Sequence, residues 1–153
     1  MLKFALGLVV LVLLFAVLLR LFENHFVFYP SRYTPGRWQQ ERLALQAEDC
    51  FFKTSDGLTL HGWFVPHEAA LGTLLWCHGN AGNLADRFDN LLRLSHLPVN
   101  VFIFDYRGYG RSEGSPSENG IYLDAEAAYD YLRSRGLRSE RIIIFGRSLG
   151  GAV

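Results

Sequence analysis

The sequence has few cysteines, no excess of charge of either sign and no low-complexity tract. Two cysteines in 153 residues cannot form a disulfide scaffold. Basic and acidic side chains number 15 each, so no sequence-wide basic field attracts nucleic acid, and we expect no nucleic-acid partner. Half of the residues are hydrophobic, which excludes disorder for most of the chain. The length suffices for one modest domain and not for two.

Nucleotide-binding motifs are also missing. The sequence contains no G-K-[ST] loop, and no G-x-G-x-x-G follows the first strand of a predicted βαβ unit. Both motifs supply the glycines that let a backbone approach phosphate groups closely. Their absence argues against a Rossmann-type nucleotide binder.

A long uncharged run occupies the N-terminus. Phe4 to Leu19 carries no charge and lies between Lys3 and Arg20. If Arg20 snorkels, residues 4–22 form a helix of about 28 Å, close to the hydrocarbon thickness of roughly 30 Å. A buried core helix would show a polar stripe, which this run lacks. A cleaved signal peptide would have a shorter apolar run followed by small residues, whereas residues 21–26 are mostly bulky. We expect an uncleaved anchor that contacts the lipid bilayer through residues 4–22.

The segment after the anchor, residues 23–46, is expected to be a juxtamembrane linker, with a short helix beginning at Trp38 and reaching Ala47. Residues 26–38 mix five aromatic side chains with two arginines. This mixture suits a membrane–water boundary, and packing of the aromatics on the domain would explain it equally well.

Flanking positive charges indicate an orientation for the predicted single-pass anchor. Lys3 precedes the apolar run, and Arg20, Arg32 and Arg37 follow it. Because positive charges near a span tend to stay in the cytoplasm, this asymmetry favours a domain on the cytoplasmic face, without fixing the side.

From about residue 47, short apolar runs alternate with amphipathic segments. A hairpin is predicted over residues 49–65, because Ser55-Asp56-Gly57 is a turn signal between two β-like runs. Three later apolar runs, at 73–77, 99–104 and 141–145, lack alternation of polar and apolar residues. Predicted helices over 84–96 and 117–134 separate them. This pattern indicates an α/β fold with a mostly parallel sheet and helices on both faces. The domain boundaries that follow are 1–22 for the anchor, 23–46 for the linker and 47–153 for the domain.

Glycine-rich segments follow the three later strands, at 78–83, 105–114 and 146–151. The carboxyl ends of parallel strands meet at one edge of the sheet, where ligand sites of α/β proteins lie. We therefore expect these three segments to form one rim that carries the chemistry.

The sharpest motif on that rim is Gly146-Arg147-Ser148-Leu149-Gly150. It follows an apolar strand and opens a predicted helix, which is the context of a nucleophile elbow. Such a turn holds its serine strained and exposed, and the flanking glycines leave room for closely approaching backbones. The helix N-terminus offers N–H groups to an oxyanion. The competing interpretation is a glycine-rich strand–helix turn with an incidental serine.

A second oxyanion donor is expected from the earlier loop that begins His78-Gly79-Asn80, because an oxyanion hole takes one N–H from beside the nucleophile and one from a neighbouring loop. We predict the backbone N–H groups of Asn80 and Leu149 as donors. Gly79 is predicted to shape the loop, as Gly146 and Gly150 shape the elbow. A plain βα loop is the alternative for this segment.

Other polar residues near the rim are expected to be structural. His78 would lie near Ser148 and could serve as a base, but a histidine that shapes the turn is the favoured interpretation. Ser112 lies on a loop with no helix behind it and is interpreted as loop packing. His61 and His67 are interpreted as surface or packing residues.

At these motifs the chain resembles α/β-hydrolase-fold serine hydrolases. More closely it resembles their membrane-anchored, serine-aminopeptidase-like subgroup, on the residues 75–83, 104–114 and 145–151 together with the apolar N-terminus. The resemblance covers about residues 47–153 and implies a serine, an acid and a histidine in that chain order. It implies cleavage of an ester, thioester or amide in a small-molecule, acylated or peptidic substrate through an acyl-enzyme on Ser148, with no metal and no cofactor.

The triad implied by the resemblance is incomplete in this chain. Five residues follow Ser148, and none is Asp, Glu or His. We expect a C-terminally truncated domain whose acid and histidine lie beyond residue 153, so that this fragment alone is inactive. Its strand at 141–145 would then be a bare apolar edge. The alternative function is a non-catalytic α/β-hydrolase-fold protein that acts as a membrane-tethered interaction module.

Overall fold

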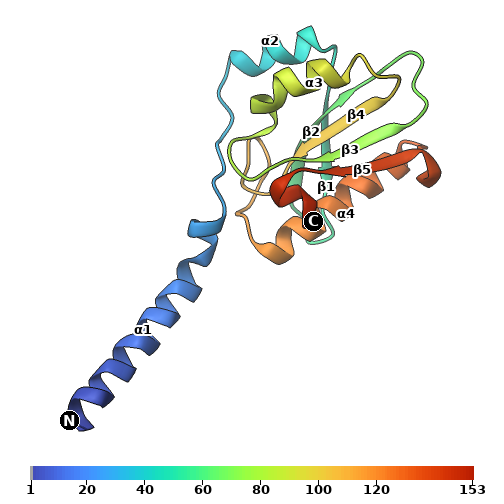
Figure 1. Ribbon diagram of the computed structural model, residues 1–153. Coiled ribbons are helices and arrows are strands. Elements are labelled where there is room, and N and C mark those ends of the chain that lie inside the picture. Colours follow the sequence, from blue (N-terminus) through green and yellow to red (C-terminus); the bar gives the residue numbers. More distant parts are fainter. Residues whose placement is uncertain (1) are drawn as a thin grey trace.

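The computed structural model describes residues 2–153 and shows a long N-terminal helix that projects from a sheet domain (Figure 1). Helix α1 runs from Leu2 to Val27. Its segment Leu6–Val27 is long and apolar enough to cross a membrane, and none of its most apolar stretch is buried. The helix extends five residues past the predicted end at residue 22. Arg20 and Glu23 form an ion pair one turn apart, which supports this extension, and the first proline is Pro30.

The expected linker is partly helical and lies against the domain. Residues 29–33 run along it, because Pro30 forms a parallel bridge with Gly82 and Arg32 forms one with Gly110. Helix α2 follows at Arg37–Ala44. It ends before the predicted Ala47, because the chain turns at Gln46, whose φ is 52°.

The aromatic side chains of this segment differ in burial. Phe28 and Trp38 are buried in the domain, whereas Phe26, Tyr29 and Tyr33 are exposed. Packing on the domain therefore accounts for two of the five aromatics.

Five strands form one mixed sheet in the order β1-β2-β4-β3-β5. Their bounds are Glu48–Lys53 for β1, Thr59–Val65 for β2, Thr73–Cys77 for β3, Asn100–Asp105 for β4 and Ile142–Gly146 for β5. Strand β3 pairs in parallel with both β4 and β5, which confirms the parallel arrangement predicted for the three later strands. The hairpin β1–β2 adds two antiparallel pairings, β1 with β2 and β2 with β4.

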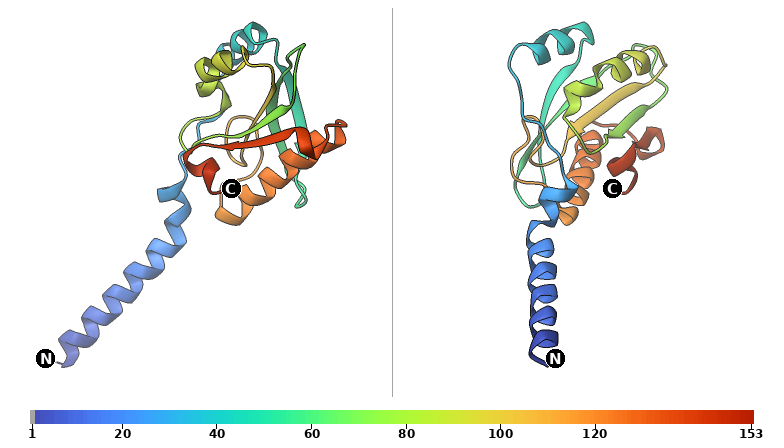
Figure 2. Two further views of the ribbon diagram at one scale, coloured as in Figure 1. Left: turned by 45° about the vertical axis from the view of Figure 1, so that its right-hand side comes forward. Right: turned by 60° about the vertical axis from the view of Figure 1, so that its left-hand side comes forward.

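Helices cover both faces of the sheet (Figure 2). Helix α4, Glu118–Ser134, lies on one face and begins after Ser117, whose side chain accepts a hydrogen bond from the N–H of Gly120. The predicted helix 84–96 is shorter: a 3₁₀ turn over Leu84–Arg87 precedes α3 at Phe88–Leu94. A capping box formed by Asn83 and Asp86 fixes that 3₁₀ turn. Two further 3₁₀ turns lie at Ser139–Arg141 and Ser148–Gly151.

Two hydrophobic clusters hold these layers together, one on each face. The first joins α4 to the sheet through side chains such as Ile121, Ala128 and Leu132. The second joins α2, the 84–87 turn and α3 to the other face through Trp38 and Leu91 among others. Strands β3 and β4 are therefore buried, whereas β5 lies at the edge of the sheet with most of its apolar side chains exposed, as expected for the run at 141–145.

Candidate active site

Ser148 lies at the sharp turn between β5 and the 3₁₀ turn that follows it. Its φ is 55°, and Gln46 is the other non-glycine residue with a positive φ in the part of the chain that the structure describes. A left-handed serine is strained, and such strain persists where the surrounding structure over-determines it, often at functional sites. The Ser148 side chain is also exposed. The structure thus presents this serine as a nucleophile elbow would.

Close backbone contacts enforce the turn. A Cβ atom on Gly150 would overlap the carbonyl oxygen of Cys77 at the end of β3, and one on Gly146 would overlap the carbonyl oxygen of Gly150. The N–H of Arg147 also donates to Cys77 O over 3.1 Å. Both predicted elbow glycines therefore lie where no side chain fits.

The loop after β3 lies directly against the elbow. A Cβ on Gly79 would stand 3.5 Å from the Cβ of Ser148 and 3.4 Å from the carbonyl oxygen of Arg147. The structure therefore brings the predicted loop glycine to the predicted nucleophile, although they lie 69 positions apart in the sequence. Asn80, the predicted donor, is the next residue in this loop.

The side chain of Asn80 fixes the loop to the end of α1. Its Nδ2 donates to the carbonyl oxygen of Val27. Its Oδ1 accepts hydrogen bonds from the N–H of Tyr29 at 3.1 Å and from the hydroxyl of Tyr109 at 2.8 Å. Sequence reasoning assigned only the backbone of Asn80 and missed this role of its side chain.

His78 points into the protein and forms part of a buried pair. Its Nδ1 lies 2.7 Å from the carbonyl oxygen of Gly79, and its Nε2 lies 3.3 Å from Oδ1 of Asp105. Both side chains are fully buried, and the His78 ring packs against Tyr106 and Tyr109. Because both ring nitrogens face these neighbours, the geometry supports the structural interpretation of His78.

Asp105 is a residue that the sequence reasoning did not single out. Besides facing His78, its Oδ1 accepts a hydrogen bond from the N–H of Leu84 over 2.8 Å. It thus connects the end of β4 to the start of the helix behind the 78–83 loop. Its position as the first acidic residue after an apolar run is the signal that could have identified it.

The loop after β4 is fixed by a buried arginine. Nε of Arg107 donates to Asp124 of α4 over 2.9 Å, and its two terminal nitrogens donate to Asp56 over 2.8 and 3.1 Å. The hydrogen bonds from Arg107 to Asp56 are the main reason that the pKa of Asp56 falls to about 2, and a hydrogen bond from the Thr54 hydroxyl adds to the effect. Ser112 accepts a hydrogen bond from His61 N and donates to Asp105 O, which confirms its predicted role in loop packing.

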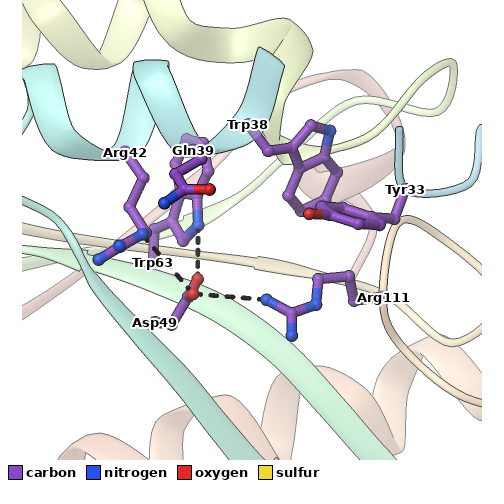
Figure 3. Close-up of a pocket in the computed structure, with 7 residues that line it drawn as sticks. All are labelled: Tyr33, Trp38, Gln39, Arg42, Asp49, Trp63 and Arg111. Atoms are coloured by element: carbon purple, nitrogen blue, oxygen red, sulfur yellow. Dashed lines mark hydrogen bonds and ion pairs between the residues drawn. The ribbon is translucent and has the colours of Figure 1, made fainter. Parts of the chain in front are cut away.

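A separate polar pocket of about 210 Å³ lies between α2 and the β1–β2 hairpin (Figure 3). Asp49 is its centre: it accepts a hydrogen bond from the Trp63 indole over 3.0 Å and forms ion pairs with Arg42 and Arg111. Burial raises the pKa of Asp49, but the interaction with His61 and the charges of Arg111 and Arg42 outweigh this effect and hold the pKa below its usual value.

His61 packs beneath this pocket, with Nε2 2.8 Å from Oδ1 of Asp49. It is fully buried, so of the two predicted environments for His61, packing is correct and the surface is wrong. The lining of the pocket contains no residue of the elbow or of the 78–83 loop, and its polar groups serve to join α2 to the hairpin.

Metal ligands are not grouped in the part of the chain that the structure describes: residues 2–153 contain no cluster of three or more His, Cys, Asp or Glu side chains able to hold an ion. Cys50 and Cys77 are both free and buried. Burial raises the pKa of the Cys77 thiol to about 11, so it is a poor source of thiolate.

Comparisons with known proteins point to one fold. A family model described as alpha/beta hydrolase fold matches residues 72–153. The alpha/beta hydrolase domain-containing protein WAV2 of Arabidopsis thaliana is 47% identical over 116 residues, which cover 73% of this chain and 38% of that protein. Uncharacterized protein YfhR of Salmonella typhi is 44% identical over 112 residues, which cover 69% of this chain and 38% of that protein.

Solved structures give the same result. The Pyrococcus furiosus esterase Pf2001 is 25% identical with a TM-score of 0.65, covering 81% of this chain and 48% of that structure. The chain spans less than half of the length of each of these three proteins.

Proposed function

Because the chain belongs to the alpha/beta hydrolase fold family, we propose that it is the N-terminal portion of a membrane-anchored serine hydrolase. This enzyme would cleave an ester, thioester or amide through an acyl-enzyme on Ser148. The oxyanion donors would be the backbone N–H groups of Asn80 and Leu149. The proposal includes the serine-aminopeptidase-like subgroup, and it places the acid and the histidine of the triad outside residues 1–153.

The observation that carries the proposal is the conformation of Ser148. Ser148 combines a φ of 55° with an exposed position. It lies between Gly146 and Gly150, and a Cβ at either glycine would overlap a backbone oxygen. An incidental serine in a strand–helix turn has no need of a left-handed backbone, which costs a non-glycine residue of order 1–3 kcal/mol. An exposed nucleophile with oxyanion donors beside it does need that geometry.

The reaction follows from these positions. The Ser148 Oγ attacks the acyl carbon while its proton passes to the triad histidine, and the two N–H groups stabilise the developing oxyanion. The bond to the leaving group breaks as the histidine returns the proton to it. Water then attacks the acyl-enzyme by the same route and releases the acid. The esterase activity named for the Pyrococcus structure supports carboxylic-ester chemistry for this chain.

A fluorophosphonate probe tests the nucleophile in the full-length protein. Ser148 should be labelled, because an activated elbow serine attacks phosphorus as it attacks a carbonyl carbon. Ser148→Ala should abolish labelling while the protein stays folded, and Ser139→Ala, at an exposed serine of a 3₁₀ turn, should leave it unchanged. The 153-residue chain alone should not be labelled, because it lacks the proposed base.

Absence of labelling in the folded full-length protein would support the non-catalytic alternative, an interaction module. Strong labelling of the isolated chain at Ser148 would contradict the placement of the base outside residues 1–153.

The membrane anchor is the second part of the proposal, with residues 1–22 as anchor, 23–46 as connecting segment and 47–153 as the hydrolase portion. The apolar surface of α1 supports the anchor. Its most apolar stretch, within Leu6–Val27, is not buried in the domain, and the 22 residues of this segment include just two charged ones, Arg20 and Glu23. The protein should stay in the membrane fraction after carbonate washing, and release into the supernatant would refute the anchor. Reporters fused after Val153 should place the domain on the cytoplasmic face, which the flanking charges favour.

A further inference from the structure

A groove of about 290 Å³ connects the end of α1 to the elbow. Its walls are mostly apolar and come from α1, from the start of α4 and from the residues just after Ser148; they are Val27, Phe28, Ile121, Tyr122, Leu149 and Ala152. Polar side chains complete the lining: Arg20, Glu23 and Asn24 on α1, where Arg20 and Glu23 form an ion pair, and Glu118 at the start of α4. The groove thus has an apolar interior and a charged rim.

The groove is held in place by backbone and side-chain bonds between the anchor exit and the 79–82 loop. Asn80 bonds to Val27 and Tyr29. Gly82 exchanges two hydrogen bonds with this segment, accepting from Ser31 N and donating to Tyr29 O, each over 3.1 Å. The end of α1 and the candidate oxyanion loop are therefore one unit, and Figure 2 shows the turn at Ser148–Gly151 near the point where α1 joins the domain.

The position of Val27 along α1 sets the depth of the groove. If residues 4–22 cross the hydrocarbon, Val27 lies five residues beyond them, or about 7.5 Å further at 1.5 Å per residue. The interfacial layer of a bilayer is about 5–8 Å thick on each side. Because the α1 part of the lining runs from Arg20 to Phe28, the groove would then extend from the edge of the hydrocarbon to the level of the lipid headgroups. Exposed aromatic side chains at Phe22, Phe26 and Tyr29 suit the same level.

We propose that the substrate of Ser148 is an acyl ester of a bilayer phospholipid, with its acyl chain lying in this groove. The inference rests on the proposed function and on the anchor. A phospholipid ester lies between the hydrocarbon and the headgroups, which is the depth of the groove, and a chain entering along Val27 and Tyr122 reaches Leu149, the residue next to the nucleophile. Ser148 Oγ forms a bond to the acyl carbon and the ester oxygen leaves with the proton as a lysophospholipid. Water then releases the fatty acid.

The test compares two substrates of the full-length protein in vesicles of palmitoyl-oleoyl phosphatidylcholine and phosphatidylglycerol at about 4:1. One rate is the release of fatty acid from the vesicle lipid, and the other is hydrolysis of water-soluble p-nitrophenyl acetate. Val27→Trp should fill the groove and lower the ratio of the first rate to the second at least tenfold. Phe26→Trp, at an exposed neighbour outside the lining, should leave the ratio within about twofold.

The outcomes separate this inference from the proposed function. Hydrolysis of p-nitrophenyl acetate without release of fatty acid, or a ratio that Val27→Trp leaves unchanged, overturns the lipid substrate while the serine hydrolase stands. Cleavage of an S-palmitoyl peptide in place of lipid overturns it equally. If the wild-type protein neither releases fatty acid nor hydrolyses p-nitrophenyl acetate, and is not labelled by the fluorophosphonate probe, the proposed function itself is overturned.

A second measurement needs no variant. A phosphatidylcholine with a diazirine at the end of its acyl chain, placed in the same vesicles, should crosslink to peptides that contain Val27 or Tyr122. Crosslinks confined to residues 4–22 would contradict the groove as the site of the acyl chain.

Discussion

The Cα atom of Gly150 lies so close to the carbonyl oxygen of Cys77 that a methyl group on Gly150 would overlap it. This relationship joins the turn after the nucleophile to the end of the neighbouring strand β3, and it allows only glycine at position 150.

Gly150→Ala should therefore destabilise the protein. The clashing atom is backbone of a central strand, so relief requires movement of the sheet or of the turn, at about 1–3 kcal/mol or more. Thermal unfolding followed by near-UV circular dichroism would measure the loss. Gly151→Ala is the matched control, because the nearest atom to a Cβ at Gly151 is 4.0 Å away. Equal melting temperatures for the two variants would contradict the close approach.

The buried pair of His78 and Asp105 should contribute strongly to stability. Asp105→Ala removes the acceptor for Leu84 N and the carboxylate 3.3 Å from His78. The change leaves the buried N–H of Leu84 without its acceptor and removes the polar neighbour of His78, which should cost about 1–3 kcal/mol. Denaturant unfolding measures this cost, and His96→Ala, at an exposed histidine, should stay within about 0.5 kcal/mol of wild type. A loss below about 1 kcal/mol for Asp105→Ala would mean that the pair does not hold the loop.

The ion pair of Asp56 with Arg107 should make stability depend on acid pH. The pKa of Asp56 is about 2 in the folded protein against an ordinary value of 3.8. A carboxyl whose pKa is lower in the folded than in the unfolded state stabilises the protein at every pH above the unfolded-state pKa. This contribution disappears as the pH falls from about 4 to about 2. The melting temperature of wild type should therefore exceed that of Asp56→Asn near neutral pH, and the difference should shrink across that window. Glu68→Gln, at an exposed carboxylate, should show no such convergence, and a constant difference for Asp56→Asn would refute the linkage.

The side chain of Asn80 should act as a positioning group for the proposed oxyanion hole. Asn80→Ala keeps the backbone N–H but loses the bonds to Val27, Tyr29 and Tyr109. We expect fluorophosphonate labelling of Ser148 to slow about 10–100-fold, since loss of a whole oxyanion donor costs about 10²–10³. With a soluble ester the loss should fall on kcat more than on KM. Tyr109→Phe removes one of the bonds and should slow labelling less, so equal labelling rates in Asn80→Ala and wild type would show that the bonds do not position the donor.

The sequence predicts the strands and the turn at Ser148 because each depends on local patterns. Unbroken apolar runs identify the buried strands β3 and β4 and also β5, whose side chains are largely exposed. Glycines spaced around a serine predict the sharp turn at Ser148. Three strands confirmed as parallel neighbours follow from that alternation alone. Ser148 has a left-handed backbone conformation just after β5, and its role as the nucleophile stays a proposal.

Other features could not be predicted, because they depend on partners distant in the sequence. His61 belongs to a strand whose register sets it opposite Asp105, and its burial follows from that pairing and not from its neighbours in the chain. The bridges from Pro30 to Gly82 and from Arg32 to Gly110 are made by backbone atoms, which leave no trace in the pattern of side chains. The end of α1 likewise depends on where the chain first contacts the domain.

Because a chain is synthesised from its N-terminus, residues 29–33 are made before the residues to which these bridges attach them. Arg32 donates to the carbonyl oxygens of Ser112 and Gly114, and the first of these is 80 residues further along. At about 5–20 residues per second, synthesis of that interval takes roughly 4–16 s. During this time α1 is already complete while the segment behind it still lacks the partners at residues 110–114. Closure of the domain onto residues 29–33 is therefore a late event in synthesis of the chain.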